Sequence, residues 1–111
     1  MTADLHVEVE GEGPALLLLH GFTGSTATIW PLGRTLTDRR TVLAVDLPGH
    51  GQTGLLDPPD HRFESTLDAL VRILDQRGID EVDVLGYSMG GRLALGLAVR
   101  HPERVRSTVL I

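Results

Sequence analysis

The sequence predicts an α/β fold in which a mostly parallel sheet carries helices on both of its faces. Short runs of continuous apolar residues, typical of strands buried on both sides, recur along the chain. Segments with helical periodicity separate these runs, which favours parallel pairing through helical crossovers. A turn-rich segment follows each of three runs, and the carboxyl ends of parallel strands are where such sheets bind ligands.

Two strands are predicted within the first 19 residues. Residues 5–10 (LHVEVE) alternate between apolar and polar, which indicates a strand with one face in water. Glycines and a proline at 11–14 predict a turn. Residues 15–19 (ALLLL) are the first continuous apolar run and predict a strand that is buried on both sides.

A short helix and a further buried strand are expected next. We expect the helix to begin around Pro31, because proline suits the first position of a helix. The strand is predicted over 41–45 (TVLAV), and a turn over 46–51 (DLPGHG) follows it. Asp46, directly after the strand, is interpreted as a residue that stabilises this turn. Residues 55–60, with two prolines, predict a loop.

The clearest helix follows that loop. Its apolar positions share one helical face, and they are Phe63, Leu67, Leu70, Val71 and Leu74. Ser65 with Asp68 resembles a capping box, and Gly78 is suited to ending the helix.

The last third of the chain repeats the pattern of strand, helix and strand. Residues 82–87 predict a buried strand, although Asp83 interrupts its apolar run. Residues 89–101 predict a helix, which the proline at the next position ends. Residues 107–111 begin to look like another strand, and we expect it to form an apolar, unpaired sheet edge that makes the chain poorly soluble.

Composition limits the classes of partner. The 111 residues suffice for one small domain, and 15 acidic residues against 10 basic ones give a net charge of −5. We therefore expect neither nucleic acid nor a membrane as a partner. The absence of cysteine excludes disulfides and thiolate metal sites, and we expect no metal and no cofactor. No signal peptide is recognisable and no apolar run could span a bilayer, so we expect a cytoplasmic protein.

Residues 86–90 (GYSMG) have the G-x-S-x-G pattern of a nucleophile elbow. Here a strand reverses into a helix within a few residues, so the serine takes a strained backbone conformation and its flanking positions must be glycine. We predict that Ser88 is the catalytic nucleophile, with its hydroxyl at the N-terminus of the helix. The alternative is a serine that only caps the helix on a glycine-rich turn.

An acyl-transfer site also needs two N–H groups that stabilise an oxyanion. We predict the backbone N–H of Met89, directly after the nucleophile, and that of Phe22, in the turn after residues 15–19. The alternative is that His20 and Gly21 only end the strand.

These motifs carry a family resemblance. The order of His20-Gly21, the turn at 46–51 and the elbow resembles the N-terminal part of the α/β-hydrolase superfamily. The segments LHGFTGS, VDLPGHG and LGYSMGGRLAL are most similar to 2-succinyl-6-hydroxy-2,4-cyclohexadiene-1-carboxylate synthases of menaquinone biosynthesis. The resemblance implies that residues 1–111 are the N-terminal portion of a single core domain, truncated before the lid and before the loops that carry an Asp and a His.

The resemblance also implies a substrate. Arg92 lies four residues after Ser88, and a guanidinium can bind a carboxylate with two parallel hydrogen bonds. Arg92 would hold a small-molecule carboxylate and Tyr87 would shape the pocket, whereas the alternative for Arg92 is a surface salt bridge. The implied reaction is a lyase reaction, in which Ser88, activated by a histidine, removes a proton and pyruvate is eliminated. Trp30 is interpreted as a core residue.

In this superfamily the triad acid and histidine follow the serine along the chain. Residues 89–111 contain neither in a suitable loop, and His101 at a helix end is expected on the wrong side of the sheet. We therefore expect negligible turnover from this polypeptide alone. Three hypotheses stay open: a lyase of the menaquinone pathway, a carboxylesterase or other serine hydrolase of the same fold, and a truncated pseudoenzyme or binding module.

Overall fold

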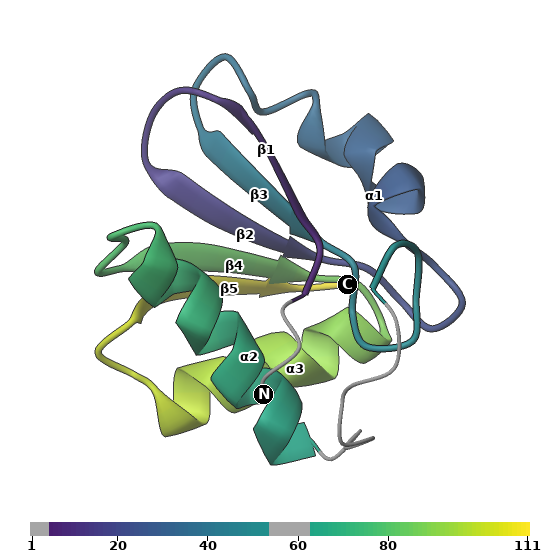
Figure 1. Cartoon of the computed structure of the whole chain (residues 1–111). Coiled ribbons are helices and arrows are strands. Elements are labelled where there is room, and N and C mark those ends of the chain that lie inside the picture. The colour runs from purple at the N-terminus through teal and green to yellow at the C-terminus, as the bar shows by residue number, and fades with distance from the viewer. Residues whose placement is uncertain (1–4, 54–62) are drawn as a thin grey trace.

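A computed structural model describes residues 5–53 and 63–111, and in them a five-stranded sheet lies between helices on its two faces (Figure 1). The strands lie in the order β1-β3-β2-β4-β5, with β1 antiparallel to β3 and the other neighbours parallel. The strands are β1 (Val7–Gly11), β2 (Ala15–Leu19), β3 (Thr41–Val45), β4 (Val82–Gly86) and β5 (Val105–Leu110). The helices are α1 (Thr26–Gly33), α2 (Phe63–Gln76) and α3 (Met89–Arg100).

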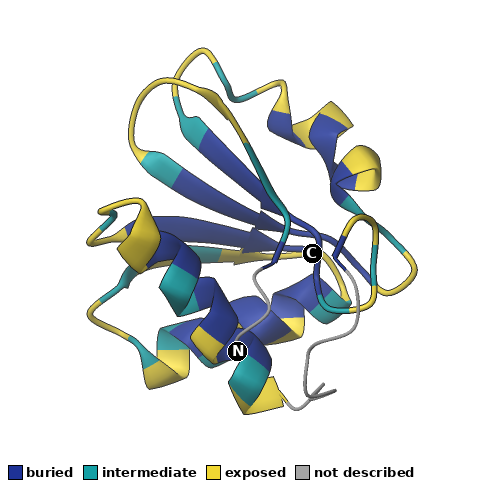
Figure 2. Cartoon of the chain, in the orientation of Figure 1, coloured by how far each residue is buried: buried dark blue, intermediate teal, exposed yellow. Residues whose placement is uncertain are grey.

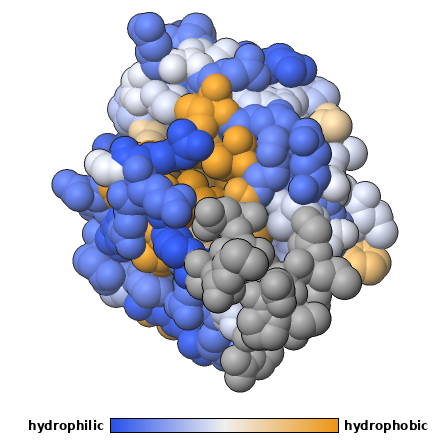
Figure 3. All heavy atoms as spheres, viewed as in Figure 1, coloured by the Kyte–Doolittle hydropathy of each residue, from blue (hydrophilic) through white to orange (hydrophobic). Residues whose placement is uncertain are grey.

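The central strands pack their alternate residues into two separate apolar layers. Leu17 and Leu19 of β2 point into the larger layer, which α2 and α3 cover. Leu16 and Leu18 point to the other face, where α1 covers them with Ile29 and Trp30. Dark blue runs along the central strands and the inner sides of the helices in Figure 2. Much of the surface in that orientation is polar, with apolar side chains gathered in its middle (Figure 3).

The strands β2 and β3 have the predicted bounds, and α3 ends one residue earlier than predicted. β4 also ends one residue early, and β5 begins at Val105, two residues before the predicted start. β5 lies at the edge of the sheet, and the side chains of Val109, Leu110 and Ile111 are half or more exposed. The predicted loop at 55–60 lies outside the described residues.

The prediction that a helix begins around Pro31 is wrong. α1 begins at Thr26, because Ser25 forms a capping box with Thr28. The Ser25 hydroxyl accepts from the N–H of Ala27, and the N–H of Ser25 donates to the hydroxyl of Thr28 at 2.9 Å. These bonds satisfy N–H groups that the first turn of a helix leaves unpaired, so the cap decides where the helix begins. Pro31 lies inside the helix and is exposed.

The capping box predicted for α2 is also wrong. The helix already includes Phe63, so Ser65 lies within its first turn. The prediction for Gly78 is confirmed: it has φ +66°, and a Cβ there would meet no atom within 4 Å. Glycine is favoured here by its left-handed backbone conformation and not by lack of space. This conformation ends the helix, and the N–H of Ile79 donates to the carbonyl of Leu74.

Asp83, which interrupts the apolar run of β4, is buried in a polar cluster. Its carboxylate accepts hydrogen bonds from Arg106, from the hydroxyl of Ser107 at 2.6 Å and from Arg40. The Arg106 guanidinium, with Ser107 and Arg40, holds the pKa of this carboxyl well below its usual range despite burial. The carboxylate therefore ties β5 to the segment before β3. In the described parts of the chain, no helix is long and apolar enough to cross a membrane.

Candidate functional site

The register of the sheet brings the three turns of the site together. Leu19 pairs with Val45 of β3 on one side and with Gly86 of β4 on the other. Since these strands are parallel, their three following turns leave the same edge of the sheet side by side. A further hydrogen bond of 3.0 Å, from the N–H of Tyr87 to the carbonyl of Leu19, joins the first turn to the elbow.

The chain reverses sharply at Ser88, between the last residue of β4 and the first of α3. Ser88 has φ 53° and ψ −109°, a conformation that an L side chain rarely adopts, and it is exposed. A Cβ on Gly90 would lie 2.6 Å from the carbonyl oxygen of His20, and one on Gly86 would overlap the backbone of Gly90. Both glycines are therefore required by close backbone contacts.

Ser88 is the N-cap residue of α3, but its side chain makes no capping hydrogen bond. A serine that served only as a cap would accept a bond from the first turn of the helix. The backbone N–H of Ser88 donates instead to the carbonyl of Ile111 at 2.7 Å. The strained backbone thus leaves the hydroxyl at the surface beside the first amides of the helix.

The two amides predicted for an oxyanion are placed at this edge. Phe22 lies in the turn after β2 and Met89 is the first residue of α3. Within residues 5–53 and 63–111, neither N–H takes part in a hydrogen bond. Phe22 belongs to a four-residue turn closed by a bond of 2.9 Å between the N–H of Gly24 and the carbonyl of Gly21. Thr23 takes a positive φ of 65° in this turn.

His20 is fully buried beneath these turns and uses both of its ring nitrogens. Its Nε2 accepts from the N–H of Leu47 at 3.0 Å, and its Nδ1 lies 2.7 Å from the carbonyl oxygen of Gly21. An acceptor at Nε2 and a carbonyl at Nδ1 fix the neutral tautomer with the proton on Nδ1. Burial lowers the pKa of His20, and the nearby His50 lowers it further. His20 therefore connects two turns and is not available as a base.

Asp46 stabilises its turn, as predicted. The buried carboxylate accepts from the N–H of Gln52 at 3.0 Å and from the N–H of Thr26, the first residue of α1, at 2.7 Å. A negative charge at a helix N-terminus is favourable. Gly51, with φ +52°, approaches this carboxylate so closely that a Cβ would overlap it.

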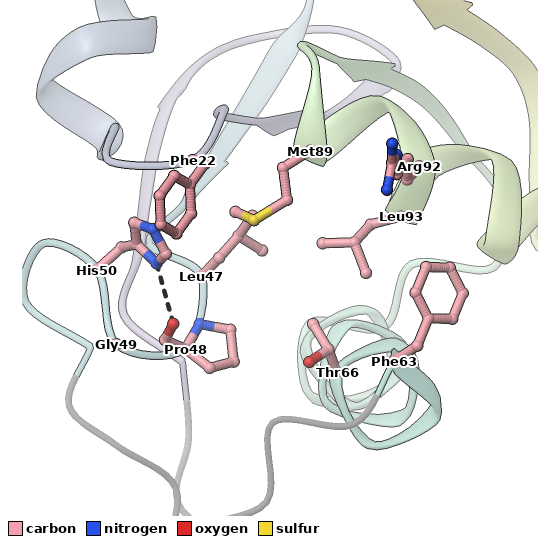
Figure 4. A pocket seen from close by; sticks show the side chains of 10 residues that line it. All are labelled: Phe22, Leu47, Pro48, Gly49, His50, Phe63, Thr66, Met89, Arg92 and Leu93. Atoms are coloured by element: carbon pink, nitrogen blue, oxygen red, sulfur yellow. Dashed lines mark hydrogen bonds between the residues drawn. The ribbon is translucent and has the colours of Figure 1, made fainter.

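A pocket of about 450 Å³ opens between these turns and α2 (Figure 4). Phe22 and Met89, whose amides are described above, line it together with Arg92. Figure 4 shows Phe22 and His50 at one end and Phe63 with Thr66 of α2 at the other. The remaining lining residues are mainly apolar: Leu47, Pro48, Gly49 and Leu93.

Arg92 is exposed and, in the described part of the chain, forms no ion pair. The alternative of a surface salt bridge within these residues therefore has no support. Tyr87 lies apart from Arg92, at a second pocket of about 310 Å³ that His20 and Thr28 also line. A Cβ on Gly21 would come within 2.9 Å of the Tyr87 ring. The structure therefore separates the two residues predicted to bind one substrate, and Phe22 lines both pockets.

Trp30 is a core residue, as predicted, and is only 3% exposed. Its indole N–H donates to the carboxylate of Glu8 on β1 at 2.5 Å. Hydrogen bonds from His6 and Trp30 lower the pKa of the Glu8 carboxyl. This contact connects α1 to the antiparallel strand, away from Ser88.

The sequence did not single out His50, Phe63 or Thr66 as part of a site. Phe63 had been assigned only to the apolar face of a helix, and its exposure beside the pocket is seen only in the tertiary structure. His101 caps the end of α3 remote from Ser88, as predicted. Among the described residues, no histidine hydrogen-bonds to Ser88, and no cluster of three His, Asp or Glu residues could hold a metal.

Known proteins share this arrangement. The chain is 37% identical to the pimeloyl-[acyl-carrier protein] methyl ester esterase of Shewanella woodyi over all of its length and 40% of that protein. It is 42% identical to a Bacillus subtilis protein provisionally named 2-succinyl-6-hydroxy-2,4-cyclohexadiene-1-carboxylate synthase, over 92% of this chain and 39% of that protein. An esterase from a marine microorganism superposes with a TM-score of 0.91 at 28% identity, over 97% of this chain and 41% of that one.

The chain thus spans about two fifths of the length of these relatives. The family model of the alpha/beta hydrolase fold matches residues 14–111, which include the three turns, the elbow and all of the parallel strands. The match agrees with the observed topology and with the strained serine between β4 and α3. The chain belongs to the α/β-hydrolase family, of which it has the N-terminal part of the fold.

Proposed function

We propose that Ser88 is the reacting residue of an enzyme that acts on a small-molecule carboxylate. One observation carries the proposal: the strained Ser88 exposes a hydroxyl with no capping bond, beside a pocket lined by Arg92, which forms no ion pair with any described residue. A strained backbone conformation costs stability, and such strain is typical of catalytic positions.

The backbone amides of Phe22 and Met89 are the proposed oxyanion donors. Neither amide has a partner in the described residues, and both residues line the pocket. Preorganised N–H groups stabilise developing negative charge without rearrangement. The N-terminus of α3, at which Met89 lies, adds a favourable dipole.

Arg92 supports the lyase hypothesis. It follows Ser88 by one helical turn, and its guanidinium, which has no ion-pair partner in residues 5–53 and 63–111, suits a carboxylate on the substrate. The identity to the Bacillus subtilis protein supports the same reaction. In this reaction Ser88, activated by a histidine, removes a proton from the ring, and the C–H electrons form a ring double bond. The C–O bond to the leaving group breaks at the same time, and the leaving group departs as the enolate of pyruvate, which then takes up a proton. The proposed role of Tyr87 is to shape the neighbouring pocket around Phe22.

Ester hydrolysis is the second candidate function. The similarity to the Shewanella woodyi methyl ester esterase supports it to a comparable degree. In this reaction Ser88 would attack the ester carbonyl, and the oxyanion of the intermediate would accept hydrogen bonds from the N–H groups of Phe22 and Met89. The alcohol would then leave, and water would hydrolyse the acyl-enzyme. A binding module without chemistry is the outcome if the protein shows neither activity.

The test compares pyruvate release with cleavage of p-nitrophenyl esters by the complete gene product. We expect Ser88→Ala to abolish pyruvate release, with a loss on the order of 10⁴-fold or more. Arg92→Ala should raise KM for the carboxylate substrate by roughly 10- to 100-fold, as expected for a lost charged hydrogen bond. Arg100→Ala is the matched control, since Arg100 also lies on α3 but pairs with Glu64.

Three outcomes separate the hypotheses. Ester cleavage without pyruvate release would replace the lyase by the esterase. Turnover that survives Ser88→Ala would refute both. An unchanged KM in Arg92→Ala, with the fold intact by circular dichroism, would remove the role of Arg92.

A further inference from the structure

The end of the pocket remote from Phe22 is formed by Phe63 and Thr66 of α2, and the ring of Phe63 is the large apolar group there (Figure 4). Phe63 is the first residue of α2, and 39% of it is exposed. A large apolar side chain at the surface beside a pocket is available for contact with a bound molecule.

The ring of Phe63 packs against Gly96 of α3. A Cβ on Gly96 would lie 2.5 Å from both Cε2 and Cζ of Phe63, and 3.1 Å from Cδ1 of Leu67. These distances are far shorter than van der Waals contact, so the ring lies directly on the helix backbone. Glycine is unfavourable inside a helix, and here it permits the close approach of α2.

The position of Gly96 relates the ring to Arg92. Gly96 follows Arg92 by four residues, so the two lie on one face of α3, one turn apart. In Figure 4 the pocket extends from Phe22 and Met89, past Arg92 and Leu93, to the Phe63 ring. A carboxylate at Arg92 would therefore direct an apolar chain along Leu93 toward this ring.

We propose that Phe63, packed on Gly96, sets the maximum length of the apolar chain that the pocket accepts from a carboxylate held by Arg92. The proposal rests on the role of Arg92 in the proposed function, but it requires no chemistry at Ser88. The ligand class is an aliphatic carboxylate of limited length. Phe63 is a residue that determines specificity, and Gly96 positions it.

The experiment measures dissociation constants of straight-chain carboxylates from butyrate to decanoate, by calorimetry with the complete gene product. For the unmodified protein we expect affinity to rise with each methylene and then to stop rising at a limiting length. Phe63→Ala should move this limit by about two methylenes, so that the first acids beyond it bind about tenfold more tightly. Phe63→Leu, which keeps an apolar contact with α3, should give an intermediate limit.

A double-mutant comparison tests the role of Gly96. Gly96→Ala should displace the ring and change the ratio of long-chain to short-chain affinity at least threefold. The same substitution should have no effect on this ratio in Phe63→Ala, because the ring is then absent. Leu95→Ala is the control on the neighbouring residue of α3, which is exposed and does not line the pocket.

The outcomes distinguish this inference from the proposed function. A limiting length that Phe63→Ala leaves unchanged, or the absence of carboxylate binding at all lengths, would overturn the inference. Additive effects of the two substitutions would overturn the role of Gly96. A limit that shifts as expected, in a protein without turnover dependent on Ser88, would support the inference and refute the proposed function.

Discussion

Replacement of Ser88 by glycine should stabilise the protein, whereas replacement by alanine should not. Ser88 has φ 53° and ψ −109°, and its side chain makes no capping hydrogen bond. Alanine keeps the Cβ that causes the strain and loses only the hydroxyl. Glycine removes the Cβ, and strain of this kind costs about 1–3 kcal/mol.

The expected gain follows from two opposing terms. Relief of strain favours the glycine variant, but the greater freedom of glycine in the unfolded chain costs about 0.5–1 kcal/mol. We therefore expect Ser88→Gly to exceed Ser88→Ala by about 1 kcal/mol in the free energy of unfolding. For a domain of this size, the difference corresponds to about 4 °C in Tm.

Urea titrations of the two variants, followed by circular dichroism, measure this difference. Ala27→Gly is the matched control, since Ala27 is exposed in α1 and glycine should there cost about 1 kcal/mol. The sign of the glycine effect should thus reverse between the two positions. If Ser88→Gly were no more stable than Ser88→Ala, the conclusion that the elbow stores backbone strain would be wrong.

Two further predictions concern buried polar groups. Asp83→Asn should lower the free energy of unfolding by about 2 kcal/mol at pH 7 in a urea titration, because it removes the charge that Arg106 and Arg40 share. Folding lowers the pKa of Asp83, so its contribution to the free energy of unfolding is complete above the unfolded pKa and is lost as the pH falls toward the folded pKa. The difference in stability between the unmodified protein and Asp83→Asn should therefore become smaller below about pH 4. For His20, nitrogen NMR at pH 7 should find a single ring proton, on Nδ1, and a titration midpoint below that of an ordinary histidine, because burial lowers its pKa. A proton on Nε2 at pH 7 would contradict the tautomer given above.

The pH dependence that arises from His20 has a definite sign. At a pH below the ordinary histidine pKa, His20 is protonated in the unfolded chain but stays neutral in the folded protein, because folding lowers its pKa. The contribution of this group to the free energy of unfolding is therefore complete above about pH 6.5 and falls as the pH is lowered. Titrations at pH 7 and pH 5.5 should show the fall, and His20→Asn should reduce it. An identical fall in His20→Asn would assign it to other groups.

The sequence by itself determined the fold class, the strands β2 and β3, and the position of the elbow. These features depend on local requirements: a strand buried on both faces needs a continuous apolar run, and a sharp reversal into a helix needs glycine on both sides of the serine. The start of α1 is also encoded locally. The prediction relied on Pro31, whereas the cap at Ser25 determines where the helix begins.

Only the tertiary structure decided the polar contacts and the shape of the pocket. The partners of Asp83 come from before β3 and from β5, the tautomer of His20 depends on Leu47, and the ring of Phe63 meets Gly96 from another helix. It also placed Tyr87 at a different pocket from Arg92, although only four residues separate them in the chain. Contacts between distant segments depend on strand register and helix packing, and no local pattern of residues encodes either.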